Sequence, residues 1–262
     1  MNAITLDIPG ILALIAAGCL AGIMNSIAGG GTLVTFPTLI FVGLPSIPAN
    51  ATSTIALLPA ALSSAAAYRS RIGAVARWLR IFAPVSLLGG LLGGVLLVRT
   101  PTTTFDSFVP FLILFATILF MAQASVTRFL GTRSRKGETR SRKWIVGGVI
   151  FQFAVAVYGG YFGAGIGILM LASLGMMGFE DVHEMNTLKV MLGFLINVIA
   201  AFYFIANGLV HWPSAAIMAC GTILGGYGGA HIAQRIPQPR VRGLITTIGL
   251  VISAVMFYRQ FA

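Results

Sequence analysis

The amino-acid sequence predicts an all-α polytopic membrane protein composed of two inverted repeats. Three observations predict this fold: an apolar composition, apolar runs of membrane-spanning length, and a duplication between the halves. Hydrophobic residues make up 57% of the 262 residues and charged residues only 9%, whereas a soluble domain is about a quarter charged. These charged residues are too few to cover a surface that faces water, so much of the exterior is expected to face lipid.

The apolar runs are continuous and recur along the whole chain. Long segments are expected at residues 8–28, 51–68, 78–98, 108–130, 144–158, 187–207, 213–233 and 241–261. A helix of about 20 residues spans the hydrocarbon core at about 1.5 Å per residue. Strands of membrane barrels instead alternate apolar and polar residues in pieces of about ten. Continuous runs therefore favour helices.

The two halves repeat at an offset of 136 positions (165 − 29 = 136). The coincident pairs are Ala28 and Ala164, Gly29 and Gly165, Gly31 and Gly167, Leu33 and Leu169, Asn50 and Asn186, Gly89 and Gly225, Gly90 and Gly226, Gly93 and Gly229, Arg99 and Arg235, and Pro101 and Pro237. In a chain with 32 glycines, chance alone aligns some of them. Chance is not expected to align an asparagine and an Arg-x-Pro at the same offset as well. The expected units are a first repeat at 1–130, a basic linker at 131–143 and a second repeat at 144–262.

A short apolar stretch after the first long segment sets the topology of each repeat. The stretch 33–44 covers only about 18 Å as a helix, less than the core of about 30 Å. The long segment and its short partner are therefore expected to form a glycine-broken hairpin that returns to its starting side. Three transmembrane helices then follow, and an odd number of crossings inverts the second repeat, as in known transporters.

Loop charge sets the orientation. The linker region carries seven basic residues against Glu138 alone: Arg128, Arg133, Arg135, Lys136, Arg140, Arg142 and Lys143. The positive-inside rule makes this linker cytoplasmic and the N-terminus periplasmic. The loop with Arg69, Arg71, Arg77 and Arg80 then also falls inside, in agreement with its charge. The same rule accounts for the net charge of +11 without nucleic acid as a partner.

The glycine breaks are the first candidate binding site. A broken helix at membrane depth exposes backbone amides that, with the helix dipole, attract an anion. In an inverted pair the two tips meet near the midplane. The candidate substrate-binding residues are Gly29, Gly30, Gly31 and Thr32 in the first break and Gly163, Gly165 and Gly167 in the second. The alternative is that these glycines only allow close helix packing.

A polar cluster follows each break and adds further candidates. They are Asn50, Thr52 and Ser53 in the first half, beside Thr54, and Asn186, Thr187 and Lys189 in the second. Asn50 and Asn186 are expected either to cap their helices or to contact the substrate. Lys189 either supplies positive charge to an anion, or pairs with Glu180, Asp181 or Glu184 and extends to the interface.

Other motifs favour structural roles or exclude enzyme classes. Gly89-Gly90-x-x-Gly93 and its equivalent at Gly225 are expected to be helix-packing faces. Cys19 and Cys220 lie within apolar runs and are expected to be free packing residues. The sequence has no Walker-type loop and no Cys/His set with zinc spacing. It is therefore not expected to be an enzyme or to bind a cofactor or a metal.

These motifs resemble the TauE/SafE sulfite-exporter family over nearly the whole chain. They are Ala28-Gly29-Gly30-Gly31-Thr32, Pro37 and Asn50-Ala51-Thr52-Ser53 in the first half, and Gly159-Gly160-Tyr161-Phe162-Gly163-Ala164-Gly165-x-Gly167, Asn186-Thr187 and Lys189 in the second. The resemblance implies transport of sulfite, sulfonates such as sulfoacetate, or other small organosulfur anions. Met185 and Leu188 depart from the smaller or more polar residues expected there, which leaves the exact substrate open.

The combined expectation is a secondary permease for a small sulfur-containing anion in a bacterial inner membrane, acting by alternating access. Its expected partners are the anionic substrate and the lipid bilayer. The oligomeric state is left open between a monomer and a homodimer. A membrane scaffold or partner subunit, and an anion channel, are the alternative functions.

Overall fold

The computed structural model describes residues 6–27, 30–132, 142–179, 181–232 and 238–261, and it is helical throughout these ranges. The elements are α1 (Ile8–Ile27), α2 (Thr32–Phe41), α3 (Ser46–Ala67), η1 (Arg69–Arg71), α4 (Ile72–Arg99), α5 (Thr102–Thr132), α6 (Arg142–Tyr161), α7 (Ile166–Met176), α8 (Val182–Ala206), α9 (Trp212–Ile232) and α10 (Gln238–Phe261). The prediction of an all-α fold is confirmed.

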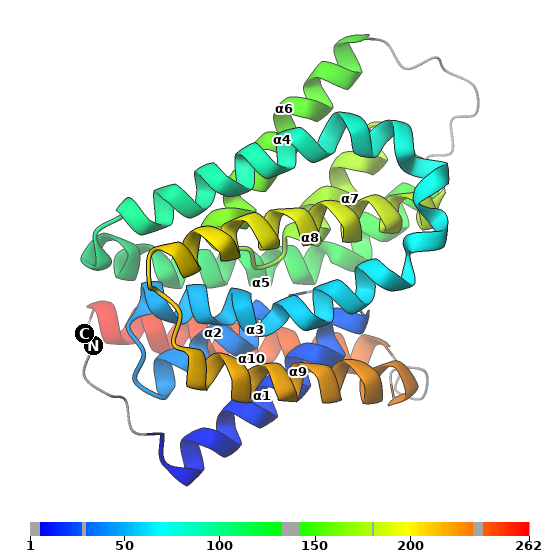
Figure 1. The fold of residues 1–262 in the computed structure, drawn as a ribbon. Coiled ribbons are helices and arrows are strands. Elements are labelled where there is room, and N and C mark those ends of the chain that lie inside the picture. The colour runs from blue at the N-terminus through cyan, green and yellow to red at the C-terminus, as the bar shows by residue number, and fades with distance from the viewer. Residues whose placement is uncertain (1–5, 28–29, 133–141, 180, 233–237, 262) are drawn as a thin grey trace.

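The helices form one bundle whose long members run across the molecule from end to end (Figure 1). α1 packs along α9, α4 lies against α6 and α8, and α5 lies against α10. α3 contacts both α8 and α9, and its first half, from Ser46 to Ala56, holds most of its buried residues. The short helices α2 and α7 follow α1 and α6, and each packs on the long helix before it.

Several helices begin earlier than hydropathy predicts. α3 begins at Ser46 and not at residue 51, and α4 and α5 begin at Ile72 and Thr102 and not at 78 and 108. Pro48 lies in the first turn of α3, where the missing amide of a proline removes no helical hydrogen bond. Hydropathy marks the part of a helix that faces lipid, whereas the polar first turns at the membrane ends are helical as well.

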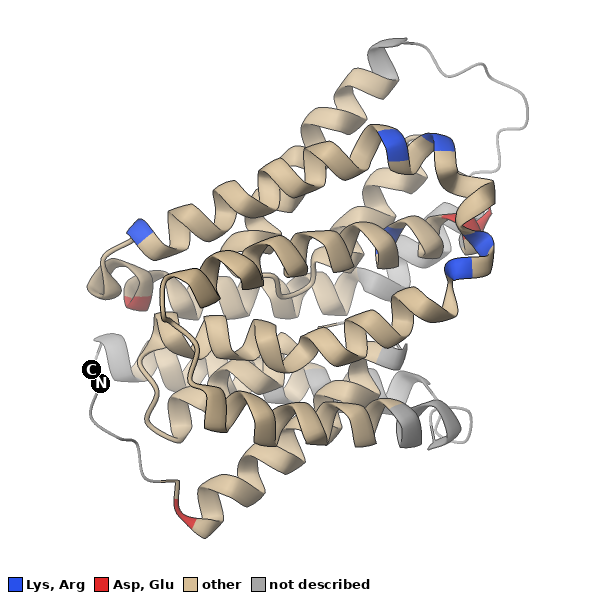
Figure 2. Cartoon of the chain, viewed as in Figure 1, with Lys and Arg blue, Asp and Glu red and all other residues tan. Residues whose placement is uncertain are grey.

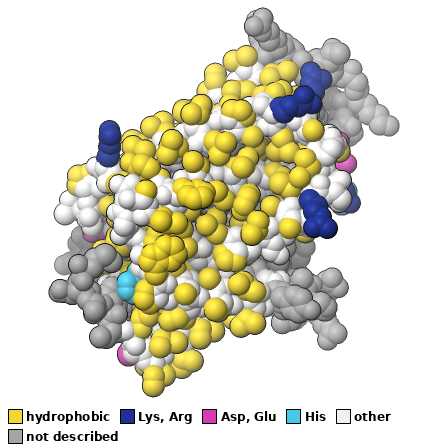
Figure 3. Space-filling view, in the orientation of Figure 1, with side chains coloured by type: hydrophobic (Ala, Val, Ile, Leu, Met, Phe, Trp, Pro, Cys, Tyr) yellow, Lys and Arg dark blue, Asp and Glu magenta, His cyan; other side chains and the backbone are white. Residues whose placement is uncertain are grey.

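Charge and apolar surface are distributed as a bilayer requires. Charged side chains gather at the two ends of the bundle, and the body between them carries almost none (Figure 2). The same body presents a broad hydrophobic face (Figure 3). Large apolar side chains such as Phe111, Phe202 and Leu224 are more than half exposed. Four described helical stretches are long and apolar enough to span a membrane: Ile8–Asn25, Arg69–Arg99, Thr102–Ala122 and His183–Ala206. The chain is a multi-pass membrane protein.

Glycines bring the long helices into backbone contact. A methyl group at Gly93 on α4 would meet the backbone of α6 at Val157 and Gly160, and one at Gly225 on α9 would meet the backbone of Cys19 on α1. The expected packing role of the Gly-Gly-x-x-Gly motifs is confirmed at these positions, while the surroundings of Gly229 lie outside the described part. Cys19 and Cys220 are free, as predicted.

Candidate functional site

A cavity of about 150 Å³ lies between α3 and α8, and both glycine breaks open onto it. A space of roughly 10–15 Å³ already holds one water molecule, so this cavity has room for a small anion. Residues from both predicted clusters line it: Gly30, Thr32, Gly163, Gly165, Gly167 and Lys189. Seven more polar or small residues line it as well: Asn25, Thr54, Ala60, Ala61, Ser64, Gly193 and Asn197.

The second break connects α6 to α7 through two glycines in the left-handed region. Gly163 has φ 82° and Gly165 has φ 78°, a conformation that residues with a Cβ rarely adopt. The Tyr158 hydroxyl donates a 2.7 Å hydrogen bond to the carbonyl of Ala164 and holds this turn in place. α7 then begins at Ile166. The amide of Ile168 donates to the carbonyl of Gly165 at 3.0 Å. The amides of Ile166 and Gly167, two residues that line the cavity, precede any intrahelical partner and are donors there.

The first break connects α1 to α2 in a related way. Gly30 has φ 99°, and its carbonyl accepts the amide of Leu33 at 3.0 Å as α2 begins. The side-chain oxygen of Asn25 accepts the amide of Gly31 at 3.1 Å. This bond fixes the Asn25 amide group so that its NH2 is left for another acceptor. Gly29, also a predicted site residue, lies outside the described residues.

Lys189 provides the positive charge of the cavity. Its aliphatic stem lies over Gly167, where an added Cβ would be 3.2 Å from Lys189 Cδ. Among the residues that line the cavity it is the charged one. Asp181 accepts the amide of His183 at 2.7 Å instead, and no acidic residue within the described ranges forms an ion pair with Lys189. The interpretation that Asp181 or Glu184 neutralises this lysine is therefore not supported, and Glu180 lies outside the described residues.

The remaining predicted residues do not line the cavity. Asn50 donates its side-chain amide to the carbonyl of Tyr161 at 3.0 Å. Thr52 accepts the amide of His211 at 3.0 Å, and Ser53 lies 2.6 Å from Thr35 in a buried hydroxyl pair. These bonds connect α3 to α6, to His211 just before α9, and to α2. The Thr187 hydroxyl donates to the carbonyl of His183 in its own helix, 2.7 Å away. Gly31 is buried, and it lies between Gly30 and Thr32, which line the cavity. Asn186 lies in α8 and is not part of the lining.

The helix-cap prediction for Asn50 and Asn186 is wrong. α3 is capped at Pro45 and α8 at Asp181, so both asparagines lie within the helices and not at their ends. The polar stretches before them are helical, which moves each start back by about one turn. Lys189 consequently lies seven residues beyond Val182 (189 − 182 = 7), deeper in its helix than hydropathy predicts.

Two asparagines of the cavity were not predicted as site residues. Asn197 lies in the apolar middle of α8, and its side chain lines the cavity about 4.0 Å from the Cβ position of Gly163. A polar residue inside a spanning helix is itself a signal of a binding site, and this signal was available in the sequence. Asn25 gives no such signal, because its role depends on the turn that folds α2 back onto α1.

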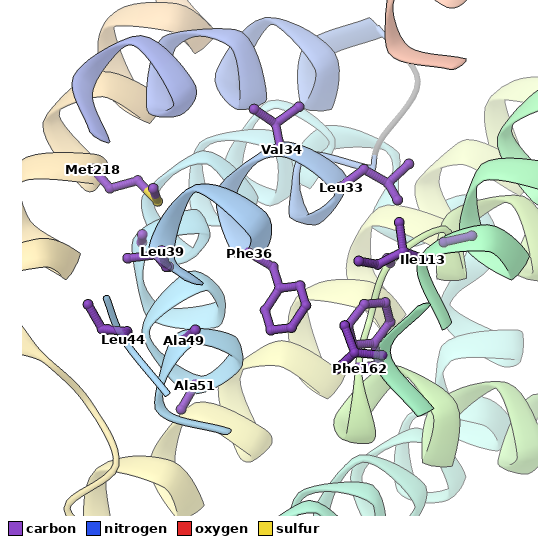
Figure 4. Close-up of a cluster of buried hydrophobic side chains, with 14 of the residues drawn as sticks. Leu33, Val34, Phe36, Leu39, Leu44, Ala49, Ala51, Ile113, Phe162 and Met218 are labelled. Carbon is purple, nitrogen blue, oxygen red and sulfur yellow. The ribbon is translucent and has the colours of Figure 1, made fainter. Parts of the chain in front are cut away.

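Aromatic rings pack beside the cavity. Phe162, which lines it, meets Phe36 edge to face at 5.3 Å, and Phe36 meets Phe105 at 6.4 Å. Phe105 also packs on Tyr161 at 5.7 Å. Figure 4 shows the Phe36 ring of α2 turned toward Phe162. Beyond Phe105 a second cavity is lined by Thr103, Asp106 and Ser107 among others.

An all-helical bundle with an apolar exterior and a cavity between broken helices defines a class of protein, the membrane transporters. Relatives of this chain are also described as membrane transporters. A "probable membrane transporter protein" of Haemophilus influenzae is 28% identical over 248 residues, which cover 94% of this chain and 94% of the relative. The probable membrane transporter proteins ORF9 of a Sinorhizobium species and YfcA of Escherichia coli are each 25% identical, over 92% and 91% of this chain and 89% and 86% of their own lengths.

Residues 14–256 match the family described as Sulfite exporter TauE/SafE. The chain belongs to this family, so the resemblance drawn from its glycine and asparagine motifs is confirmed. No solved structure matches the chain.

Proposed function

We propose that the chain is a secondary permease that moves a small sulfur-containing anion, such as sulfite or an organosulfonate, across a bacterial inner membrane by alternating access. One observation carries this proposal. The cavity gathers the two glycine breaks around Lys189, which has no acidic partner among the described residues. Lys189 is half-buried within an apolar helix. A cation there is costly in a membrane protein unless something neutralises it, and an anionic substrate does so.

The donors around the lysine fit an oxyanion. The first-turn amides of α7 carry the positive end of the helix dipole. The side-chain NH2 groups of Asn25 on α1 and Asn197 on α8 add neutral donors to the lining of the cavity. An oxyanion with several acceptor oxygens is therefore matched by one charge and several hydrogen-bond donors, an arrangement that selects for geometry as well as charge.

The helix order supports an inverted repeat as the basis of the mechanism. At the 136-residue offset α1 corresponds to α6, α2 to α7, α3 to α8 and α4 to α9. The packing follows the same relation, because α1 lies along α9 while α6 lies along α4. In repeat transporters one half rocks against the other around a central site. We place residues 131–143 in the cytoplasm and the N-terminus in the periplasm, on the basis of loop charge.

The aromatic contacts favour alternating access over an open channel. The chain of rings runs from Phe162, which lines the first cavity, through Phe36 to Phe105, and the residue after Phe105, Asp106, lines the second cavity. We propose that these rings close the binding cavity toward that end in the present conformation. Rearrangement of the two broken hairpins would then open that end and close the other.

Uptake of labelled sulfite and sulfoacetate into proteoliposomes tests the proposed function. The expected result is saturable uptake that Lys189→Gln removes, with the variant still eluting as a folded protein in detergent. Uptake that never saturates would identify a channel. Uptake of neither anion above empty vesicles, together with co-purification of one fixed protein, would instead support a scaffold subunit.

A further inference from the structure

Two buried oxygen atoms on α3 have no hydrogen-bond partner among the described residues. They are Oγ of Ser46 and Oδ1 of Asn50, in side chains that are only 6% and 1% exposed. Such atoms are rare in folded proteins, because an oxygen that leaves water without finding a new partner loses its hydrogen bonds. The two residues are four positions apart in the helix (50 − 46 = 4), so they lie one above the other on the same face.

This face of α3 reaches both cavities. Thr54 follows Asn50 by another four residues (54 − 50 = 4), and it lines the binding cavity. Ser46, at the other end, lines the second cavity together with Asp106. Ser46, Asn50 and Thr54 therefore form one polar face that extends from the second cavity to the binding cavity, with Asn50 between the two.

The polar face of α3 is closed at Asn50 in this conformation. The Asn50 side chain donates to the carbonyl of Tyr161 at 3.0 Å, which joins α3 to the last residue of α6 before the second break. Tyr161 in turn packs on Phe105, one of the rings that we propose close the binding cavity. The bond from Asn50 thus belongs to the same closed region as these rings.

The equivalent positions in the second half are more exposed. Asn186 corresponds to Asn50 (50 + 136 = 186), and Lys189 corresponds to Ser53 (53 + 136 = 189). Asn186 and Lys189 are half-buried, whereas Asn50 and Ser53 are buried. In the inverted repeat proposed above, the two asparagines lie on opposite sides of the central site. This difference in exposure is typical of a transporter conformation that is sealed on one side only.

We propose that the polar face of α3 is the periplasmic half of the translocation route, and that Ser46 and Asn50 contact the anion as it passes between the two cavities. This inference rests on the proposed transport function. When Asn50 releases Tyr161, its NH2 and the Ser46 hydroxyl become donors to the passing anion. Asp106 is exposed at the second cavity, and its carboxylate repels an anion. The second cavity is therefore a passage and not a second binding site.

Two serines of α3 provide a matched pair for the first test. Ser46→Ala removes a buried hydroxyl that has no partner, so it should stabilise this conformation and raise Tm in detergent by about 2 °C. Because the route loses a donor, the variant should also lower the maximum rate of sulfoacetate uptake into proteoliposomes several fold and leave KM unchanged. Ser53→Ala is the control. Its hydroxyl pairs with Thr35 at 2.6 Å, so its loss should lower Tm and leave the uptake rate unchanged.

Cysteine labelling tests the route directly. Asn50→Cys and Ala56→Cys would each be made in a chain that carries Cys19→Ala and Cys220→Ala, and treated in whole cells with an anionic, membrane-impermeant methanethiosulfonate. Ala56 is also fully buried in α3, but it lies about 120° round the helix from Asn50. Asn50→Cys should react several fold faster than Ala56→Cys and lose sulfoacetate transport on reaction, because the polar face opens to the periplasm during turnover.

Either of two outcomes would overturn the route while leaving the transport function intact. One is a Ser46→Ala variant that transports at the wild-type maximum rate. The other is an Asn50→Cys variant that transports sulfoacetate but reacts no faster than Ala56→Cys. The serine pair decides alone where Asn50→Cys does not fold. Absence of sulfite and sulfoacetate uptake by the wild-type chain would instead contradict the proposed function, and the route with it.

Discussion

The two glycine breaks have related sequences but different surroundings. At the first break, Gly31 is covered by Leu57 and by Ala21, whose Cβ is 3.1 Å from the Cβ position of the glycine. At the second, Gly167 is covered only by the flexible stem of Lys189. Gly31 is thus packed more tightly than Gly167, and in the function we propose the second break is the one that carries the charge for the ligand. Duplication supplies two equivalent turns, and a few side chains determine which of them carries the charge.

The largest expected effect comes from substituting the turn glycines themselves. Gly30→Val and Gly165→Val each place a β-branched residue at a positive φ, which costs on the order of 1–3 kcal/mol and distorts the turn. Both variants should lose transport in proteoliposomes although they remain folded in detergent. Wild-type transport by either folded variant would remove that break from the binding site.

Lys189 and Ser53 occupy equivalent positions (53 + 136 = 189) and should respond differently to substitution. Lys189→Gln removes the charge of the cavity and should weaken anion binding about 10- to 100-fold, as expected for a charge-assisted hydrogen bond. Ser53→Ala breaks the buried pair with Thr35 and should cost about 1 kcal/mol of stability while leaving affinity unchanged. Isothermal titration and thermal unfolding measure both. Equal loss of affinity in the two variants would contradict the difference between the halves.

Gly31 and Gly167, the equivalent glycines of the two breaks, should also respond differently to substitution. An alanine at Gly31 would press against Ala21 and Leu57 in a packed region, so Gly31→Ala should lower stability by about 1–3 kcal/mol. An alanine at Gly167 displaces only the Lys189 stem, so Gly167→Ala should lower anion affinity by a few fold, as for other modest shifts of a binding group, with little change in stability. Thermal unfolding and anion titration of both variants check this, and the reverse pattern would contradict it.

The smallest expected effects are those of the bonds that hold the second tip. Asn50→Ala frees the carbonyl of Tyr161, and Tyr158→Phe frees that of Ala164. Each should cost about 1 kcal/mol of stability, the ordinary net value of a hydrogen bond. Thermal unfolding in detergent measures the cost. A variant as stable as the wild type would show that its bond does not hold the turn.

The sequence predicts the parts of the site that depend on local chemistry. The glycine breaks, the charge at Lys189 and the helical fold follow from composition, spacing and the cost of exposed backbone in lipid. The roles of Asn50, Thr52 and Ser53 do not, because their partners Tyr161, His211 and Thr35 are set by packing between helices.

The most direct test of the account is a crystal structure with 2-bromoethanesulfonate, whose bromine marks the carbon tail by anomalous scattering. The account predicts a sulfonate group beside Lys189, between the two glycine breaks, and an anomalous bromine peak within the same cavity. Binding in the second cavity near Asp106, or a bromine at Lys189 with the sulfonate facing away, would contradict the account.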